Sequence, residues 1–308
     1  MSEQSNPIPD DLTRADESGD KLSQQGFPSQ EQSPPGMTSE MTPTPDHGEE
    51  SYRGHGRLEG MKALITGGDS GIGRAVAIAY AREGADVAIG YLPEEQADAE
   101  QTQQWVEKAG RKCVLLPGDV RDESTCRGVV RDAVEKLGGL NVLVNNASHQ
   151  WGRGRSSGIE EITTDVLDRV MKTNVYAMIW ATQEAVKHMG EGDSIIFTSS
   201  IQAYDPSGPL MEYAATKAAE LNLAINLAGS LGSRGIRVNA VAPGPIWTPL
   251  QPATREGEEM PDFGKDTPLG RPGQPAELAG AYVFLASPSE ASYVSGTVLG
   301  VTGGRPTV

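Results

Sequence analysis

A glycine-rich stretch between an apolar run and a helical pattern places the strongest constraint on the fold of this chain. Residues 63–66 read Ala-Leu-Ile-Thr, which is typical of a short buried strand, and residues 67–73 read Gly-Gly-Asp-Ser-Gly-Ile-Gly. A helical pattern follows to about Arg82. Glycines at a turn from strand to helix let the backbone approach a phosphate group, and the first helical turn supplies free N–H groups. The stretch therefore predicts a phosphate-binding loop, although a tight turn without a ligand would use similar residues.

Six further apolar runs continue this alternation of strand and helix. They lie at 86–91, 113–116, 142–144, 194–198, 236–241 and 296–301, and the helical patterns between them include a long one at 164–189. Continuous apolar strands that alternate with helices are typical of a parallel sheet covered on both faces. We therefore predict an α/β fold with a doubly wound, Rossmann-type parallel sheet of about seven strands. In such folds the ligand lies beyond the carboxyl ends of the strands.

Three side chains downstream of the loop have the chemistry for proton transfer. Tyr213 and Lys217 are four residues apart and share a helix face, where the ammonium group favours ionisation of the phenol. Ser200 follows the strand expected at 194–198. A phenol, an ammonium and a hydroxyl beside a phosphate-binding loop are the groups needed to move a proton while a cofactor moves a hydride. The alternative is a surface helix with an incidental Tyr and Lys.

Five motifs in this order resemble the classical short-chain dehydrogenase/reductase family, from about residue 58 onward. The motifs are the glycine loop, Asn145-Asn146-Ala147, Ser200, Tyr-x-x-x-Lys at 213–217, and Pro243-Gly244 with Ile246 and Thr248. The resemblance implies an NAD(P)-dependent oxidoreductase that interconverts an alcohol or hydroxyl and an aldehyde or ketone, with Tyr213 as general acid and base. The implied catalytic residues are Asn174, Ser200, Tyr213 and Lys217. The implied cofactor-binding residues are Gly67, Asp69, Ser70, Gly71, Ile72, Gly73, Tyr91, Leu92, Asp119, Val120, Asn146, Ala147, Tyr213, Lys217, Pro243, Gly244, Ile246 and Thr248.

The resemblance also suggests roles that the residues alone leave open. It places Asp119 beside the adenine, but an Asp after a strand could instead cap a helix. It makes Asn174 hold a water on a proton relay, but the residue could also be a surface Asn. His149 and Gln150 follow the fourth strand, where a substrate could touch them, and we expect them to be solvated loop residues. The Pro-rich stretch 247–271 is expected to close over the substrate.

The cofactor is expected to be NAD or NADP, with a preference for NAD. An acidic residue at the end of the second strand binds the 2′-hydroxyl of NAD, whereas a nearby Arg favours the 2′-phosphate of NADP. The second strand ends at Tyr91-Leu92 with neither, and Ser70 stands where many NADP-preferring relatives place Arg or Lys. Glu94 and Glu95 follow, and they would repel a phosphate if they point inward.

Residues 1–50 differ in composition from the rest of the chain. They carry eleven acidic and two basic side chains, a net charge of −9 out of −16 for the whole chain. Such a segment buries too little apolar surface to offset its ordering entropy. We expect a disordered or surface-lying acidic arm over 1–50, dispensable for folding up to residue 42, and one domain over 51–308. The Pro-rich extension resembles a bacterial subgroup described as aldehyde-reductase-like or glucose-dehydrogenase-like.

The composition also argues against several other classes of protein. No apolar run approaches the ~20 residues of a membrane-spanning helix, the N-terminus lacks signal-peptide features, and the acidic balance argues against nucleic acid as a partner. The two cysteines and four histidines show no metal-ligand spacing, so we expect no metal. We expect a cytoplasmic protein that acts on a small-molecule substrate and, by resemblance, forms a homotetramer. The alternatives are a non-catalytic dinucleotide-binding sensor or scaffold and a reductase of carrier-bound acyl substrates.

Overall fold

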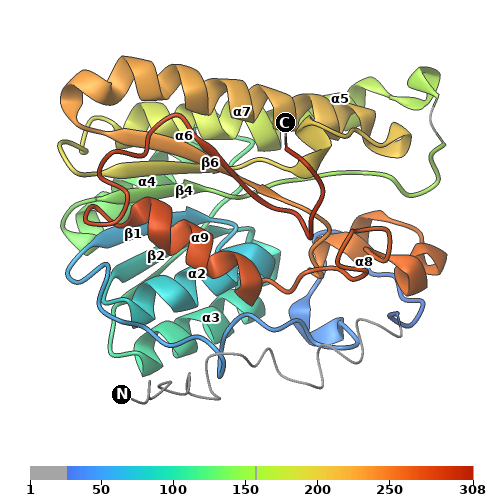
Figure 1. Ribbon diagram of the computed structural model, residues 1–308, viewed down its shortest axis with the longest axis horizontal. Coiled ribbons are helices and arrows are strands. Elements are labelled where there is room, and N and C mark those ends of the chain that lie inside the picture. The colour runs from blue at the N-terminus through green and yellow to red at the C-terminus, as the bar shows by residue number, and fades with distance from the viewer. Residues whose placement is uncertain (1–25, 157, 308) are drawn as a thin grey trace, which may run out of the picture.

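Seven parallel strands form one sheet in the order β3-β2-β1-β4-β5-β6-β7, in a computed structural model that describes residues 26–156 and 158–307 (Figure 1). The strands are β1 (Lys62–Thr66), β2 (Asp86–Tyr91), β3 (Cys113–Pro117), β4 (Val142–Asn145), β5 (Ser194–Thr198), β6 (Arg237–Pro243) and β7 (Val298–Val301). The strand order reverses its direction between β1 and β4, as in a doubly wound sheet. The predicted Rossmann-type fold is therefore confirmed.

Helices cover both faces of the sheet. One face carries α2 (Gly71–Arg82), α3 (Gln96–Lys108) and α9 (Ala276–Ala286), and the other carries α4 (Glu123–Leu137), α6 (Ala177–Ala185) and α7 (Met211–Leu231). Alternate strand residues serve the two faces, so Ile65 belongs to the core under α2 and α9 while Leu64 belongs to the core under α4 and α6. Over the described residues, no helix is both long and apolar enough to cross a membrane.

The long helix expected over 164–189 is interrupted. It consists of α5 (Thr164–Met171), a π-helical turn over Lys172–Tyr176, and α6. Asn174 lies in this turn, and its side chain bonds to neighbouring segments instead of facing solvent. A π turn inside a helix is often found at a functional site. This one includes Thr173, which lines the groove at the carboxyl ends of the strands described below.

Residues 26–50 lie against the rest of the fold and share a small, separate hydrophobic cluster with residues that follow β6. Phe27 stacks on Trp247 with the ring centroids 3.7 Å apart, and Met41 and Met260 complete the buried cluster. The Trp247 indole nitrogen donates a 2.9 Å hydrogen bond to the carbonyl of Pro43. This segment, blue in Figure 1, is therefore packed continuously with the domain that we expected to begin at residue 51. Residues 1–25 of the expected arm lie outside the described residues.

Candidate functional site

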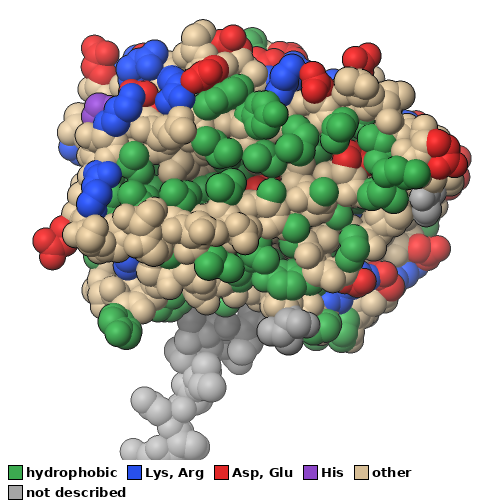
Figure 2. Space-filling view, turned by 90° about the horizontal axis from the view of Figure 1, so that it is seen from above, with side chains coloured by type: hydrophobic (Ala, Val, Ile, Leu, Met, Phe, Trp, Pro, Cys, Tyr) green, Lys and Arg blue, Asp and Glu red, His purple; other side chains and the backbone are tan. Residues whose placement is uncertain are grey.

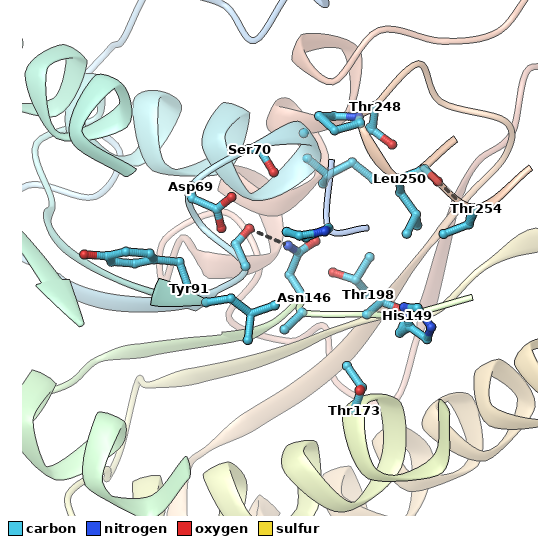
Figure 3. Close-up of a pocket in the computed structure, with 18 of the residues that line it drawn as sticks. Asp69, Ser70, Tyr91, Asn146, His149, Thr173, Thr198, Thr248, Leu250 and Thr254 are labelled. Atoms are coloured by element: carbon cyan, nitrogen blue, oxygen red, sulfur yellow. Dashed lines mark hydrogen bonds between the residues drawn. The ribbon is translucent and has the colours of Figure 1, made fainter. Parts of the chain in front are cut away.

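The glycine loop between β1 and α2 forms one wall of a groove at the carboxyl ends of the strands (Figure 3). Gly73 has no room for a side chain, because a Cβ atom there would lie 1.8 Å from the carbonyl oxygen of Gly67. The side-chain amide of Asn146 donates to the carbonyls of Thr66 (3.1 Å) and Gly67 (3.0 Å) and fixes the loop. Ser70, the N-cap residue of α2, makes no side-chain capping bond within the described residues. The first helical turn therefore leaves N–H groups beside the groove, where they suit a phosphate.

Ser200, Tyr213 and Lys217 line the same groove. Ser200 follows β5, and its hydroxyl accepts a 3.1 Å hydrogen bond from the backbone of Gln202. Tyr213 and Lys217 share a face of α7, with the Lys217 ammonium 5.3 Å from the centroid of the Tyr213 ring. The ammonium also donates to the carbonyl of Thr198 at 2.8 Å. The structure thus brings together the three groups that the sequence singled out for proton transfer.

Asn174 is fully buried, so the alternative of a surface Asn is wrong. Its side-chain amide donates to the carbonyl of His149 (2.9 Å) and the hydroxyl of Thr216 (3.0 Å). Its side-chain oxygen accepts from the backbone N–H of His149 at 2.8 Å. Asn174 therefore fixes the loop after β4 against α7 from behind the wall of the groove.

The expectation that His149 and Gln150 are solvated loop residues is wrong. His149 lines the groove (Figure 3), and its burial, together with the charges of Arg169 and Arg121, lowers the pKa of the imidazole to about 3. Gln150 is 3% exposed and donates to the Thr254 hydroxyl at 3.0 Å. The sequence did not reveal that this loop is held by Asn174 on one side and by the segment after β6 on the other.

The end of the groove where the resemblance places the adenosine lies beyond β2 and β3. It is lined by Tyr91, the last residue of β2, by Leu92, and by Asp119 and Val120 after β3. The Asp119 carboxylate accepts from the backbone N–H and the Nε of Arg121, both at 2.9 Å. Asp119 does not cap a helix, because Asp122 is the N-cap residue of α4. The capping alternative is therefore wrong for Asp119.

Two carboxyl groups, Asp69 and Glu95, also line this end of the groove. Asp69 is 1% exposed, and one of its carboxylate oxygens has no hydrogen-bond partner within the described part of the chain. Glu95 accepts a 3.0 Å hydrogen bond from the backbone of Leu92. Burial raises the pKa of both groups, and the charge of Asp69 raises that of Glu95 further. A carboxylate oxygen of the glycine loop that lacks a partner fits the hydroxyl donors of a nucleotide ribose.

The remaining wall follows β6. Pro243, Gly244, Ile246 and Thr248 all line the groove. The stretch 247–271 is less irregular than its prolines suggest, because it contains α8 (Leu250–Thr254) and a 3₁₀ helix over Gly257–Asp262. Figure 3 shows Leu250 and Thr254 at the groove, on the side away from Tyr91. Closure of this stretch over a substrate remains a prediction.

Two of the expected site residues, Gly73 and Asn174, lie behind the groove, and the others line it. Several lining residues had not been expected at the site. They include two prolines, Pro34 and Pro35, and three side chains that can carry charge or form hydrogen bonds, Arg121, His149 and Arg169. Arg121 lies two residues after Asp119, and that spacing could have drawn attention to it. Nothing in the local sequence connects Pro34 and Pro35 with a groove built from residues after position 66.

Comparisons with known proteins agree with this architecture. Residues 67–305 match a family model described as enoyl-(acyl carrier protein) reductase. The uncharacterized oxidoreductase YghA of Escherichia coli is 53% identical over 280 residues, covering 91% of this chain and 94% of its own. The NADPH-dependent aldehyde reductase 1 of Arabidopsis thaliana chloroplasts is 43% identical, covering 88% of this chain and 94% of its own.

A solved structure supports the same assignment. A short-chain dehydrogenase from Burkholderia cenocepacia in complex with NADP is 35% identical, with a TM-score of 0.73, and the match covers 80% of this chain and 98% of that one. The seven-stranded fold, the order of the motifs and these relatives agree. The chain belongs to the short-chain dehydrogenase/reductase family of oxidoreductases.

Proposed function

We propose that this protein interconverts an alcohol and an aldehyde or ketone with a nicotinamide dinucleotide, and that Tyr213 transfers the proton. The observation that carries the proposal is the common groove, which Ser200, Tyr213 and Lys217 share with the glycine loop. A dinucleotide-binding sensor or scaffold would need the loop alone. The presence of a buried phenol, ammonium and hydroxyl at the end where the nicotinamide is expected favours catalysis over binding alone.

Each of the three side chains has a distinct part in the proposed reaction. When bound, the cofactor supplies the hydride for carbonyl reduction or accepts it in alcohol oxidation. The Tyr213 hydroxyl gives its proton to the carbonyl oxygen during reduction and takes the alcohol proton during oxidation. Ser200 donates a hydrogen bond to the same substrate oxygen. Lys217 places its positive charge beside the Tyr213 ring and can bind a ribose hydroxyl of the cofactor.

Asn174 acts through the loop that it holds. Its two backbone hydrogen bonds to His149 place the imidazole on the wall of the groove. Because its pKa is lowered to about 3, His149 stays neutral and offers a neutral hydrogen-bonding group to a polar substrate. We propose that His149 with Thr254 contacts the substrate, and that Asn174 is a positioning residue.

We propose that the protein accepts NADP(H). The expected preference for NAD finds no support in the comparisons, because the Burkholderia structure holds NADP and the Arabidopsis relative is named as NADPH-dependent. Burial raises the pKa of the Glu95 carboxyl and favours its uncharged form, so Glu95 repels a 2′-phosphate less than an exposed carboxylate would. Arg169 also lines the groove and adds positive charge, whereas the charge of Arg121 is paired with Asp119.

A substrate panel tests the proposed function. The purified protein is assayed for oxidation or reduction of a nicotinamide cofactor with aldehydes, ketones, sugars, polyols and an enoyl thioester, each with NAD(H) and NADP(H). We expect NADPH-dependent reduction of at least one small aldehyde or ketone. Cofactor binding without turnover on any member would favour the sensor, and turnover confined to the enoyl thioester would favour the carrier-bound acyl reductase.

We also propose that the protein forms a homotetramer. Figure 2 shows the face above α7, on which apolar side chains gather in the middle and charged side chains lie mainly toward the rim. Large exposed apolar side chains on α5, the π turn and α7 include Leu167, Tyr176, Met211 and Ile225. An exposed apolar area of this kind is typical of a surface that another chain covers. Light scattering that gives the mass of a single chain would contradict the tetramer.

A further inference from the structure

Residues 27–43, here called the N-terminal strap, cross the groove from one wall to the other. Pro34 and Pro35 line the groove together with Ser70 and Gly71 of the glycine loop and Pro249 of the segment after β6. Figure 3 shows a short, pale blue piece of this chain between Ser70 and Leu250. The strap precedes residue 67, where the matched family model begins. It is therefore a wall of the groove added from outside the matched region.

The first half of the strap is fixed to the segment that follows β6. The backbone N–H of Gln32 donates to the carbonyl of Pro252 at 2.9 Å, and the Glu31 carboxylate accepts from the N–H of Gly257 at 2.9 Å. The Arg153 guanidinium donates to the carbonyls of Gln32 (3.2 Å) and Pro252 (2.6 Å) and joins the two segments. This side of the strap is thus attached to the part of the chain that is expected to cover the substrate.

The second half of the strap is fixed to the glycine loop through a chain of buried polar groups. The backbone N–H of Thr38 donates to one carboxylate oxygen of Asp98 at 2.9 Å. The other oxygen accepts from Arg74 at 2.9 Å, and Arg74 in turn donates to the carbonyl of Asp69 at 2.8 Å. Thr38, Asp98 and Arg74 are each at most 2% exposed. Buried charged hydrogen bonds of this kind are costly to break.

Gly36 lets the strap pass close to the other wall. Its φ angle is +88°, and a Cβ atom there would lie 2.8 Å from the carbonyl oxygen of Pro249 and 3.1 Å from the Cβ of Ala253. Any side chain at this position would therefore strain the backbone and push the strap away from Pro249.

We propose that the N-terminal strap is a built part of the dinucleotide site and limits the rate at which the cofactor leaves it. This inference rests on the proposed function. Pro34 and Pro35 would contact the cofactor beside the N-terminus of α2, and the fixed ends of the strap keep them there. Release of the cofactor then requires the strap contacts to open first, as lid opening limits turnover in many enzymes.

The test compares two glycine variants by the dissociation of NADPH. In G36A the new methyl group meets Pro249, whereas Gly56 has a similar φ of +78° and no atom within 4 Å of its Cβ position. G56A therefore carries similar backbone strain without touching the strap. NADPH is bound to each protein and chased with excess NADP⁺ in a stopped-flow fluorimeter. We expect dissociation from G36A to be faster by about tenfold, and G56A to match the wild type.

Hydrogen exchange of the wild-type protein gives a second readout that needs no variant. We expect NADPH to slow exchange at the backbone amides of Gln32 and Thr38, whose hydrogen bonds must open for release. Unchanged exchange there on NADPH binding, or an unchanged dissociation rate in folded G36A, would overturn the role of the strap. A wild-type protein that binds neither NADPH nor NADH would instead overturn the proposed function itself.

Discussion

The Lys217 ammonium lies 3.0 Å from both carboxylate oxygens of Glu220, one turn further along α7, and neither side chain is more than 1% exposed. The lysine beside Tyr213 is therefore half of a buried ion pair. The negative charge of Glu220 offsets part of the positive field that Lys217 exerts on the phenol. Tyr282 from α9 faces the same pair, and burial together with the charge of Glu220 raises the pKa of its phenol.

We expect E220Q to move the pH profile of alcohol oxidation to lower pH. Burial raises the pKa of Glu220 to about 7, against the opposing charge of Lys217. Above that pH the carboxylate offsets Lys217, and below it the proton removes the offset. In E220Q the offset is absent at every pH, so the positive charge of Lys217 acts on Tyr213 without compensation. The acid limb of the kcat profile should fall by about one pH unit.

Glu212 provides the matched control for E220Q. It lies on the same helix, is 3% exposed, and pairs with Arg155 at 2.5 Å without touching Lys217. E212Q should lower thermal stability but leave the pH profile in place. If both variants show the profile of the wild type, the ion pair of Lys217 has no part in setting the charge at Tyr213.

We expect truncation of the chain before residue 43 to destabilise the protein, contrary to the prediction from the sequence alone. Such a deletion removes Phe27 and Met41 and leaves the indole of Trp247 exposed. The milder variant F27A should cost about 3 kcal/mol, which lowers the melting temperature by several degrees for a domain of this size. Calorimetry of F27A beside S29A, a change at the neighbouring strap residue outside this cluster, measures the effect. Equal melting temperatures for F27A and S29A would show that the packing of Phe27 is dispensable for folding.

Glu83 is expected to make the protein sensitive to acid. Its carboxylate accepts hydrogen bonds from Tyr52 (2.6 Å) and Arg57 (2.6 Å) and from the backbone of His55 (2.8 Å). Burial alone would raise its pKa, but these donors outweigh burial and lower it to about 2. A depressed carboxyl pKa gives stability that is complete above the unfolded value near 4.5 and is lost as the pH falls toward 2.

The variant E83Q tests this dependence on pH. At neutral pH we expect a loss of about 2 kcal/mol, because the amide weakens the charged hydrogen bonds. Between pH 4.5 and the lowest pH that the fold tolerates, its melting temperature should fall less steeply than that of the wild type. E59Q is the control, since Glu59 is 72% exposed and its ion pair with Arg111 is worth little. Parallel curves for E83Q and the wild type would exclude this role.

The sequence predicted the parts of the fold that local pattern determines. Strands β2 and β5 begin and end where the apolar runs do, and the glycine loop lies between β1 and α2 as expected. The spacing of apolar residues within a short window is enough to predict whether a segment forms a strand or a helix. Ser200 lies at the groove because it follows β5, and parallel strands bring their carboxyl ends to one edge of the sheet. Tyr213 and Lys217 share a face of α7 as their spacing predicts, and that face lines the same groove.

Contacts between distant segments could not be predicted in the same way. Phe27 and Trp247 are 220 positions apart, and neither lies in a periodic apolar pattern that would predict its burial. His149 follows a strand in a polar stretch, so only the packing of Asn174 against its backbone reveals its place at the groove. Asp119 and Asp122 are three positions apart and equally suited to cap a helix, and the path of the chain decides between them.

We propose that Tyr213 transfers the proton in a reaction that uses a nicotinamide cofactor. The most direct measurement compares wild type, Y213F and Y293F, because Tyr293 is fully exposed at 102% and serves as the control. For each protein, kcat/KM is measured with NADPH and the best aldehyde or ketone, and the Kd of NADPH is measured by fluorescence. We predict that Y213F loses about 10²- to 10⁴-fold in kcat/KM while its Kd stays close to that of the wild type. Near-normal turnover by Y213F would contradict the account.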